Sequence, residues 1–157
     1  MQNTKSPTIQ NLEAAFAGES MAHIKYMWFA RQCRKVGDEA TAKVFEDTAA
    51  QEILHAFGHA ELLFSDETMT PAKCLQYAIE GETYEYTEMY PKFRHEAMQE
   101  GHDAAVAEID KQIAESKEHA ERFRSVLEKA AKRFAALAKV EEKHAKHYQA
   151  QKDAIAA

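Results

Sequence analysis

Residues 51–63, QEILHAFGHAELL, decide the fold, because a glutamate and a histidine interrupt an otherwise apolar helical stripe. Glu52 and His55 lie three positions apart, and the same helix face carries Phe45 and Ala49. Burying an unpaired carboxylate is costly, so a glutamate that faces a core needs a cation beside it. The stretch therefore predicts a helix whose inner face binds positive charge.

Three other segments place carboxylates or imidazoles where an apolar core is expected. Their stripes carry Glu19 in the first segment, Glu82 and Glu85 in the second, and His119 in the third, with Glu115 at the edge of its stripe. Too few core-facing Lys and Arg residues accompany these groups to neutralise them. A pair of divalent metal ions would do so, because single glutamates from two helices and Glu-x-x-His from two others form the cage of di-iron bundles. Carboxylate-rich ligation with one imidazole per metal suits iron or manganese better than structural zinc.

Each of these motifs has an ordinary explanation when it occurs alone. A Glu-x-x-His pair on a helix is commonly solvated, and Glu82-x-x-Glu85 by itself would form an exposed acidic face. Their coincidence on the predicted inner face of every hairpin favours the metal site.

The composition agrees with a single helical domain. The chain has 157 residues and a net charge of −6, which argues against a nucleic-acid backbone or an anionic membrane as its main partner. Five glycines and three prolines are too few for a barrel of many tight turns, and two cysteines cannot form a disulfide framework. No apolar run could span a membrane and the first residues lack a signal-peptide core, so we expect a cytoplasmic all-α protein.

Glycine and proline mark the expected helix boundaries. We expect helices from about residue 8 or 11 to 35, from 39 to the mid-60s, from 72 to 100 with a kink at Pro91, and from 102 onward. Thr8 or Asn11 would cap the first helix, Gly37 would end it, and Asp38 would cap the second. An internal repeat underlies them, since Glu52 follows Glu19 by 33 positions, as Glu115 follows Glu82. The pattern predicts a four-helix bundle of two pseudo-twofold hairpins. The tail after residue 130 lies outside the repeat, and either folds back as a separate helix or continues as one long helix.

Three segments resemble rubrerythrin, of the ferritin-like di-iron superfamily. They are residues 15–22, AFAGESMA, residues 51–63, quoted above, and residues 81–91, GETYEYTEMYP. The resemblance covers about residues 8–130. It implies one ferritin-like di-iron domain over residues 1–157, with the bundle core at 8–130 and an additional C-terminal helix at 131–157.

The resemblance also implies a ligand set for two iron ions bridged by oxo and carboxylate groups, with manganese as the other metal considered. The implied ligands are Glu19, Glu52, His55, Glu82, Glu85, Glu115 and His119. Tyr26 and Tyr90 match tyrosines that hydrogen-bond around such a site and take part in its chemistry. Packing as ordinary core tyrosines is the alternative for both.

The fourth helix departs from the family pattern, because Ser116 stands where a glutamate is expected three positions before His119. Glu115 lies one residue earlier, so we expect a π-bulge in this helix that brings it into the site. Glu118, and Glu141 with His144 in the tail, are the alternatives. The departure resembles symerythrin, of the erythrin type that lacks a rubredoxin domain.

The activity implied by the resemblance is that of a peroxidase. Two ferrous ions, each giving one electron, would reduce hydrogen peroxide to water without releasing hydroxyl radical. The sequence has no pair of Cys-x-x-Cys motifs to hold a rubredoxin iron, so we expect electrons from an external donor such as a rubredoxin-type protein. A ferroxidase that uses O2 and a structural metal-bound bundle without turnover are the alternatives.

The short linker between the second and third helices bears on assembly. A pseudo-twofold site requires these two helices to run parallel. About seven linker residues then reach only about 24 Å, where roughly 36 Å is needed. We therefore expect a homodimer, in which exchange of hairpins between two chains (domain swapping) would remove the shortfall.

Overall fold

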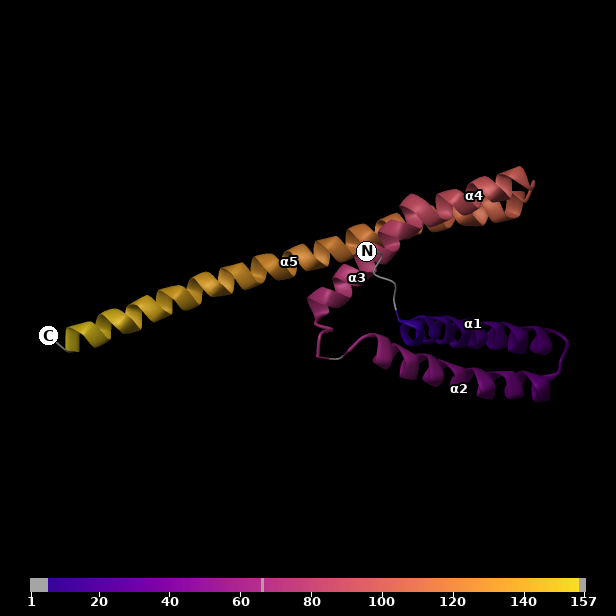
Figure 1. The fold of residues 1–157 in the computed structure, drawn as a ribbon, viewed down its shortest axis with the longest axis horizontal. Coiled ribbons are helices and arrows are strands. Elements are labelled where there is room, and N and C mark those ends of the chain that lie inside the picture. The colour runs from indigo at the N-terminus through magenta and orange to yellow at the C-terminus, as the bar shows by residue number, and fades with distance from the viewer. Residues whose placement is uncertain (1–5, 66, 156–157) are drawn as a thin grey trace. The chain divides into compact units, whose positions relative to one another are not determined.

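The computed structural model describes residues 6–65 and 67–155, and all regular elements in these ranges are helical. The elements are α1 (Pro7–Lys35), α2 (Glu39–Leu63), α3 (Pro71–Tyr84), the π-helical turn η1 (Glu85–Met89), α4 (Tyr90–Gln99) and α5 (Asp103–Ile155). They form two compact units, with the boundary between Met69 and Thr70. Figure 1 shows α1 and α2 as one antiparallel hairpin, and α3, η1 and α4 beside the first part of α5 as the other. The predicted all-α fold is confirmed.

The first hairpin turns at Gly37, whose φ of 82° lies in the left-handed region that lets a helix end sharply. Asp38 then begins α2, because its carboxylate accepts a hydrogen bond from the Thr41 backbone N–H at 3.0 Å. Both the glycine turn and the aspartate cap are as predicted. Arg34 near the end of α1 forms ion pairs with Glu46, on α2, and with Glu39 at 3.1 Å, which fasten this end of the hairpin.

The beginning of α1 differs from the prediction. The Ser6 hydroxyl accepts a hydrogen bond from the Ile9 N–H at 3.3 Å, and Pro7 occupies the first turn. Proline is favourable there because the first N–H groups of a helix have no partner within it. Thr8 and Asn11, the two expected caps, therefore lie inside the helix.

The closest approach of the helices is made by small side chains. In the first hairpin Ala30, Ala42, Ala49 and Ala56 are at most 1% exposed, and in the second Ala120 is 0% and Ser116 4% exposed. Over residues 6–65 and 67–155, no large side chain is fully buried. A two-layer hairpin can therefore bring its helices together, but it leaves apolar surface for further packing.

The second hairpin contains a π-helical turn in the place where a kink was expected. The Tyr90 N–H donates to the Glu85 carbonyl, five residues back, and Pro91 follows immediately. A proline has no N–H and its ring collides with the carbonyl four residues earlier in a regular helix, so the wider turn accommodates it. Gly101, with a φ of 75°, then ends this arm of the hairpin.

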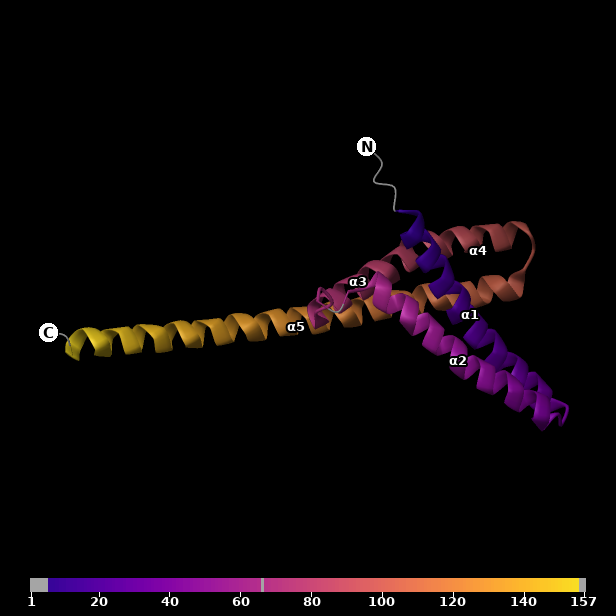
Figure 2. The same cartoon turned by 60° about the horizontal axis from the view of Figure 1, so that its bottom comes forward.

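Of the two alternatives for the tail, the structure has the one long helix over the residues that it describes. α5 runs without a break from Asp103 to Ile155, so residues 131–155 continue the helix that forms the second hairpin. No glycine or proline interrupts this stretch, and nothing in it enforces a turn. In Figure 2 the second half of α5 extends well past the start of α3. No described helix is both long and apolar enough to cross a membrane.

Candidate metal centre

The first hairpin brings together three of the predicted ligands. Glu19 on α1 and Glu52 with His55 on α2 each place one ligand atom within 4.8 Å of the others. Glu52 and His55 are one turn apart, with the histidine Nδ1 3.0 Å from the glutamate Oε2. The Glu52 side chain is only 18% exposed. Two carboxylates and one imidazole converging on a point are a donor set that fits iron or manganese.

A histidine fastens α1 to α2 beside these carboxylates. The Nδ1 of His23, one turn after Glu19, lies 2.8 Å from the Ala49 carbonyl oxygen. Since a carbonyl oxygen can only accept, this nitrogen donates, and the bond fixes the tautomer and the orientation of the ring. Ala49 is completely buried, so the two helices are in close contact at the level of this bond.

The second hairpin brings together three more of the predicted ligands. His119 Nδ1 on α5 lies 3.2 Å from Glu82 Oε1 on α3. Glu85, one turn after Glu82, accepts a hydrogen bond from the Ser116 hydroxyl at 2.9 Å. Two carboxylates and one imidazole again lie on facing helices, but here a buried serine occupies the place of a further ligand.

The position of the π-helical turn explains this serine. Glu52 follows the turn glycine Gly37 by 15 residues, and Ser116 follows Gly101 by the same 15. Glu82 precedes its turn glycine by one residue more than Glu19 does, and the wide turn η1 lies within that longer interval. The extra residue is therefore accommodated in the third segment of the sequence. The prediction of a π-bulge in the fourth helical segment is wrong, because α5 is a regular α-helix around Ser116.

Glu115 consequently faces away from the Glu85–Ser116 contact. Its carboxylate lies 3.6 Å from Lys111 Nζ, and its side chain is 44% exposed. Its role as a ligand stays a prediction. The sequence did contain a signal for the position of Ser116. Ser116 follows Gly101 by the same number of residues as Glu52 follows Gly37, whereas the distance from Glu82 points to Glu115.

The alternative pair in the tail lies far along the same helix. Glu141 Oε2 and His144 Nδ1 are 3.8 Å apart, and both side chains are exposed. They follow His119 by more than 20 residues, which is roughly 33 Å of helix at 1.5 Å per residue. Within its own unit this pair is therefore remote from Glu82 and His119.

The two predicted tyrosines lie in different surroundings. Tyr26 packs among aromatic rings, 5.9 Å from Phe45 and 6.3 Å from Phe29 between ring centroids. Burial raises the pKa of Tyr90, and the negative charges of Glu85 and Glu82 raise this pKa further. Tyr90 is thus a neutral phenol held near two of the predicted ligands, whereas Tyr26 has the environment of a core tyrosine.

Antiparallel helical hairpins that turn glutamates and histidines toward one another define an all-α protein of the ferritin-like class. The family profile described as rubrerythrin matches residues 10–127. The chain belongs to the rubrerythrin family.

Several relatives agree with this assignment. Nigerythrin of Nitratidesulfovibrio vulgaris is 38% identical over 128 residues, which cover 74% of this chain and 63% of the relative. The rubrerythrin of Porphyromonas gingivalis is 37% identical, with coverages of 78% and 66%, and that of N. vulgaris is 36% identical, with 75% and 68%. The chain thus spans about two thirds of the length of the curated relatives it matches. A solved structure of nigerythrin in the fully reduced, all-ferrous state is 32% identical, covering 83% of this chain and 70% of that one, with a TM-score of 0.40.

Proposed function

We propose that this protein is an iron-dependent oxidoreductase that reduces hydrogen peroxide to water with electrons from an external donor protein. The observation that carries the proposal is the convergence of Glu19, Glu52 and His55 within 4.8 Å. Membership of the rubrerythrin family supports it. A rubredoxin-type protein is the electron donor we expect.

The complete centre would combine the ligands of both hairpins. We assign Glu19, Glu52 and His55 from the first and Glu82, Glu85 and His119 from the second, with Glu115 as the remaining predicted ligand. Two iron ions bound there would supply Lewis acidity and, when ferrous, one electron each. Carboxylates can change between one-atom and two-atom binding, so these glutamates can follow a change in metal charge.

The protein groups around the ligands have separable roles. The Ser116 hydroxyl holds the Glu85 carboxylate toward α5 and so limits the positions it can take. The Tyr90 phenol is protonated at neutral pH, because the ordinary pKa of tyrosine is about 10 and burial raises it further. It could therefore donate a hydrogen bond to a neighbouring carboxylate. The His23 contact with the Ala49 carbonyl holds the first hairpin closed behind Glu19 and Glu52.

We further propose that the hairpins of one centre come from two copies of the chain. α2 ends at Leu63 and α3 begins at Pro71, so the helices do not fray enough to lengthen the linker appreciably. If Glu52 and Glu82 lie at the same level on parallel helices, the linker must span roughly 33 Å along the axis. Its eight Cα–Cα steps reach about 27 Å when fully extended. A domain-swapped homodimer removes the mismatch.

The activity is tested anaerobically with the full chain. The protein is loaded with iron and reduced, and its reoxidation by hydrogen peroxide and by O2 is followed separately. We expect peroxide to be much the faster oxidant, with two electrons consumed per chain. Faster oxidation by O2, with iron accumulating beyond two per chain, would instead assign a ferroxidase.

A matched pair of variants on α2 tests the site itself. Glu52→Gln removes a carboxylate at the point of convergence, whereas Glu61→Gln makes the same change at an exposed position of the same helix. We expect Glu52→Gln to lower bound iron from about two to about one per chain or less, and Glu61→Gln to leave it unchanged. Equal iron content in both variants would remove Glu52 from the site.

A further inference from the structure

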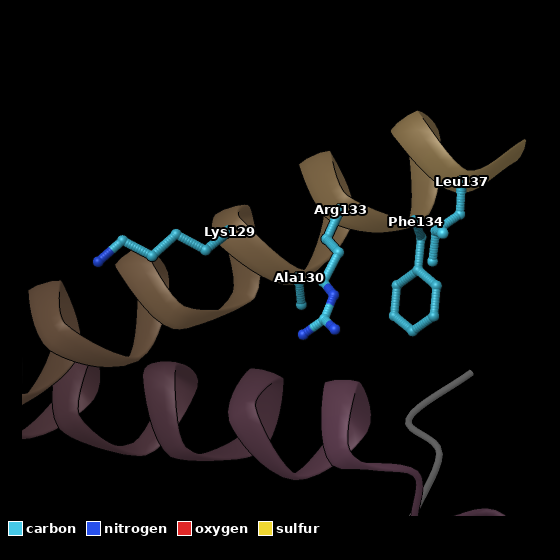
Figure 3. Close-up of a pocket in the computed structure, with 5 residues that line it drawn as sticks. All are labelled: Lys129, Ala130, Arg133, Phe134 and Leu137. Atoms are coloured by element: carbon cyan, nitrogen blue, oxygen red, sulfur yellow. The ribbon is translucent and has the colours of Figure 1, made fainter. Parts of the chain in front are cut away.

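The second half of α5 carries an apolar face that its own hairpin does not cover. Every residue from 131 to 154 is exposed, and Phe134, Leu137 and Tyr148 are 69%, 52% and 69% exposed. Phe134 and Leu137 line an open groove of about 520 Å³ with Lys129, Ala130 and Arg133, and Figure 3 shows these two apolar side chains on the same side of the helix. Such a face requires a partner in water.

The exposed face continues the seam by which α5 packs in its hairpin. Positions that alternate four and three residues apart fall on one line along a helix that pairs with another helix. On α5 this line contains Ser116, Ala120, Phe123, Leu127, Ala130, Phe134, Leu137, Glu141, His144, Tyr148 and Gln151. Its first members are buried or half-buried inside the hairpin, and those from Phe134 onward are exposed.

Most lysines in this segment lie away from the seam, whereas Glu141 lies on it and Arg133 beside it. Residues 131–155 carry six Lys or Arg against three Asp or Glu, so the segment is basic although the chain is acidic. Lys132, Lys139 and Lys146 recur every seven residues on the side of the helix opposite the seam. Alanines 131, 138 and 145 recur with the same period beside the seam, where small side chains let a second helix approach. These three lysines therefore stay apart when two segments pair along the seam.

We propose that residues 131–155 pair with the same segment of a second copy of this chain as an antiparallel two-stranded coiled coil. Self-pairing is favoured by complementary polar groups on the seam itself, a carboxylate that accepts and an imidazole that donates a hydrogen bond. In an antiparallel pair centred between residues 142 and 143, Glu141 faces His144 of the second copy, and the contact occurs twice by symmetry. The same register places Leu137 opposite Tyr148 and Phe134 opposite Gln151 of the second copy.

Other registers with the same periodicity are less favourable. A shift of one heptad in one direction places the Glu141 carboxylate against the apolar Leu137 of the second copy instead of His144. A shift in the other direction moves Phe134 past the end of the opposing helix and leaves its ring exposed. Polar residues on a seam are known to select register in this way.

Distances between spin labels test the arrangement in the full chain. In a Cys33→Ser, Cys74→Ser background, Lys132→Cys, Lys139→Cys and Lys146→Cys are labelled one at a time. Antiparallel pairing in the proposed register offsets the two labels along the axis by roughly 31 Å at 132 and by roughly 10 Å at both 139 and 146. We therefore expect equal distances at 139 and 146 and a longer one at 132.

Two charge insertions provide the matched control. Leu137→Glu places a carboxylate in the seam, and Ala136→Glu places one at the neighbouring exposed position outside it. We expect Leu137→Glu to abolish the inter-label distances and Ala136→Glu to preserve them. The proposal is overturned if all three labels report the same distance, which indicates parallel pairing. It is also overturned if no intermolecular distance is found, which indicates that the face is covered by another part of the chain.

Discussion

Ser116 combines almost complete burial with a hydrogen bond to the Glu85 carboxylate at 2.9 Å. Its place, 15 residues after the turn glycine, is the one that Glu52 holds in the first hairpin. A hydroxyl there contributes no negative charge and restrains a neighbouring ligand. The proposed ligand groups of the two hairpins therefore contain the same kinds of side chain but differ in where the carboxylates lie along the helices.

Removal of this hydroxyl has a predictable effect on stability. Ser116→Ala leaves the Glu85 carboxylate without its donor, and hydrogen bonds to charged groups contribute about 1.5–3 kcal/mol. We expect the metal-free protein to lose about 1.5 kcal/mol in urea unfolding. Ser125→Ala, an exposed change on the same helix, should have no measurable effect. Equal stabilities of the two variants would show that the hydrogen bond is not formed in solution.

The unsettled fourth carboxylate can be assigned by counting metal. Glu115→Gln and Glu141→Gln each remove one exposed or half-exposed charge from α5. If Glu115 turns from Lys111 to bind metal, Glu115→Gln lowers iron below about two per chain while Glu141→Gln does not. The opposite pattern would assign the tail pair to the centre, and no change in either would leave Ser116 as the only group at that position.

At the scale of single elements, the two hairpins have turns of the same kind. Gly37 and Gly101 both have φ near +80° and both precede a helix that carries an acidic residue nine positions later. In each hairpin that acid, Glu46 or Asp110, forms an ion pair with an arginine of the opposite arm. The repeated glycine turn and the repeated arginine–carboxylate ion pair (the arginine clasp) explain why hairpins of different sequence close in the same way.

Alanine substitution should change stability in opposite directions at the two turn glycines and at a glycine inside a helix. Gly37→Ala and Gly101→Ala add a Cβ in the left-handed region, so each should destabilise the protein by about 1 kcal/mol although nothing lies within 4 Å of the new atom. Gly58→Ala, inside α2 and equally free of contacts, should stabilise it by about 0.5–1 kcal/mol. Thermal unfolding of the three variants checks the sign of each effect.

The arginine clasps predict a dependence of stability on pH. The Arg34 guanidinium lowers the pKa of Glu46, chiefly through its hydrogen bonds, and Arg94 lowers the pKa of Asp110 in the same way. A carboxyl whose pKa is lower in the folded state stabilises the fold above its unfolded pKa, and this stabilisation disappears as pH falls through the folded pKa. Glu46→Gln should therefore lower the melting temperature slightly at pH 7 and leave it unchanged near pH 3. A constant difference across this range would assign the effect to packing.

The sequence predicts the elements better than it predicts the site. Glycine turns, the Asp38 cap and the helical period of apolar residues are local signals, and each is found in the structure. The width of a helical turn is not local, since it depends on how Pro91 and the opposing helix compete for the backbone. The extra residue was therefore detected in the sequence but assigned to the wrong helix, which left Ser116 without a role.

At the scale of the whole molecule, the small side chains at the closest contacts and the exposed apolar faces indicate that the chain needs further packing. In the proposed centre the first hairpin supplies three ligands and the second supplies the other four. The short linker is the reason for proposing that the two hairpins come from different copies. In such a swapped dimer, assembly and metal binding would be parts of one process.

Complementation between defective chains tests the exchange of hairpins. Glu52→Ala damages only the first hairpin and His119→Ala only the second. When the two variants are unfolded together and refolded, half of the dimers combine both, and in a swapped dimer one of their two centres is intact. We expect iron binding and peroxide-dependent reoxidation at about one quarter of the wild-type level.

The control is a mixture whose members share a damaged hairpin. Glu52→Ala with His55→Ala cannot yield an intact centre in any combination, so it should stay inactive. Recovery in neither mixture would show that both hairpins of a centre belong to the same chain.

The π-helical turn also bears on how the sequence arose. Apart from η1, the two hairpins place their turn glycines, clasping acids and inward-facing histidines at matching intervals, as expected of a duplicated segment. The first arms of the two hairpins have the same length, since Pro7 and Pro71 precede their turn glycines by the same number of residues. Only the interval between the glutamate and the turn glycine is longer by one residue in the second hairpin, and η1 lies in that interval. A duplicated pair of hairpins can in this way acquire two unequal halves without any change in its turns.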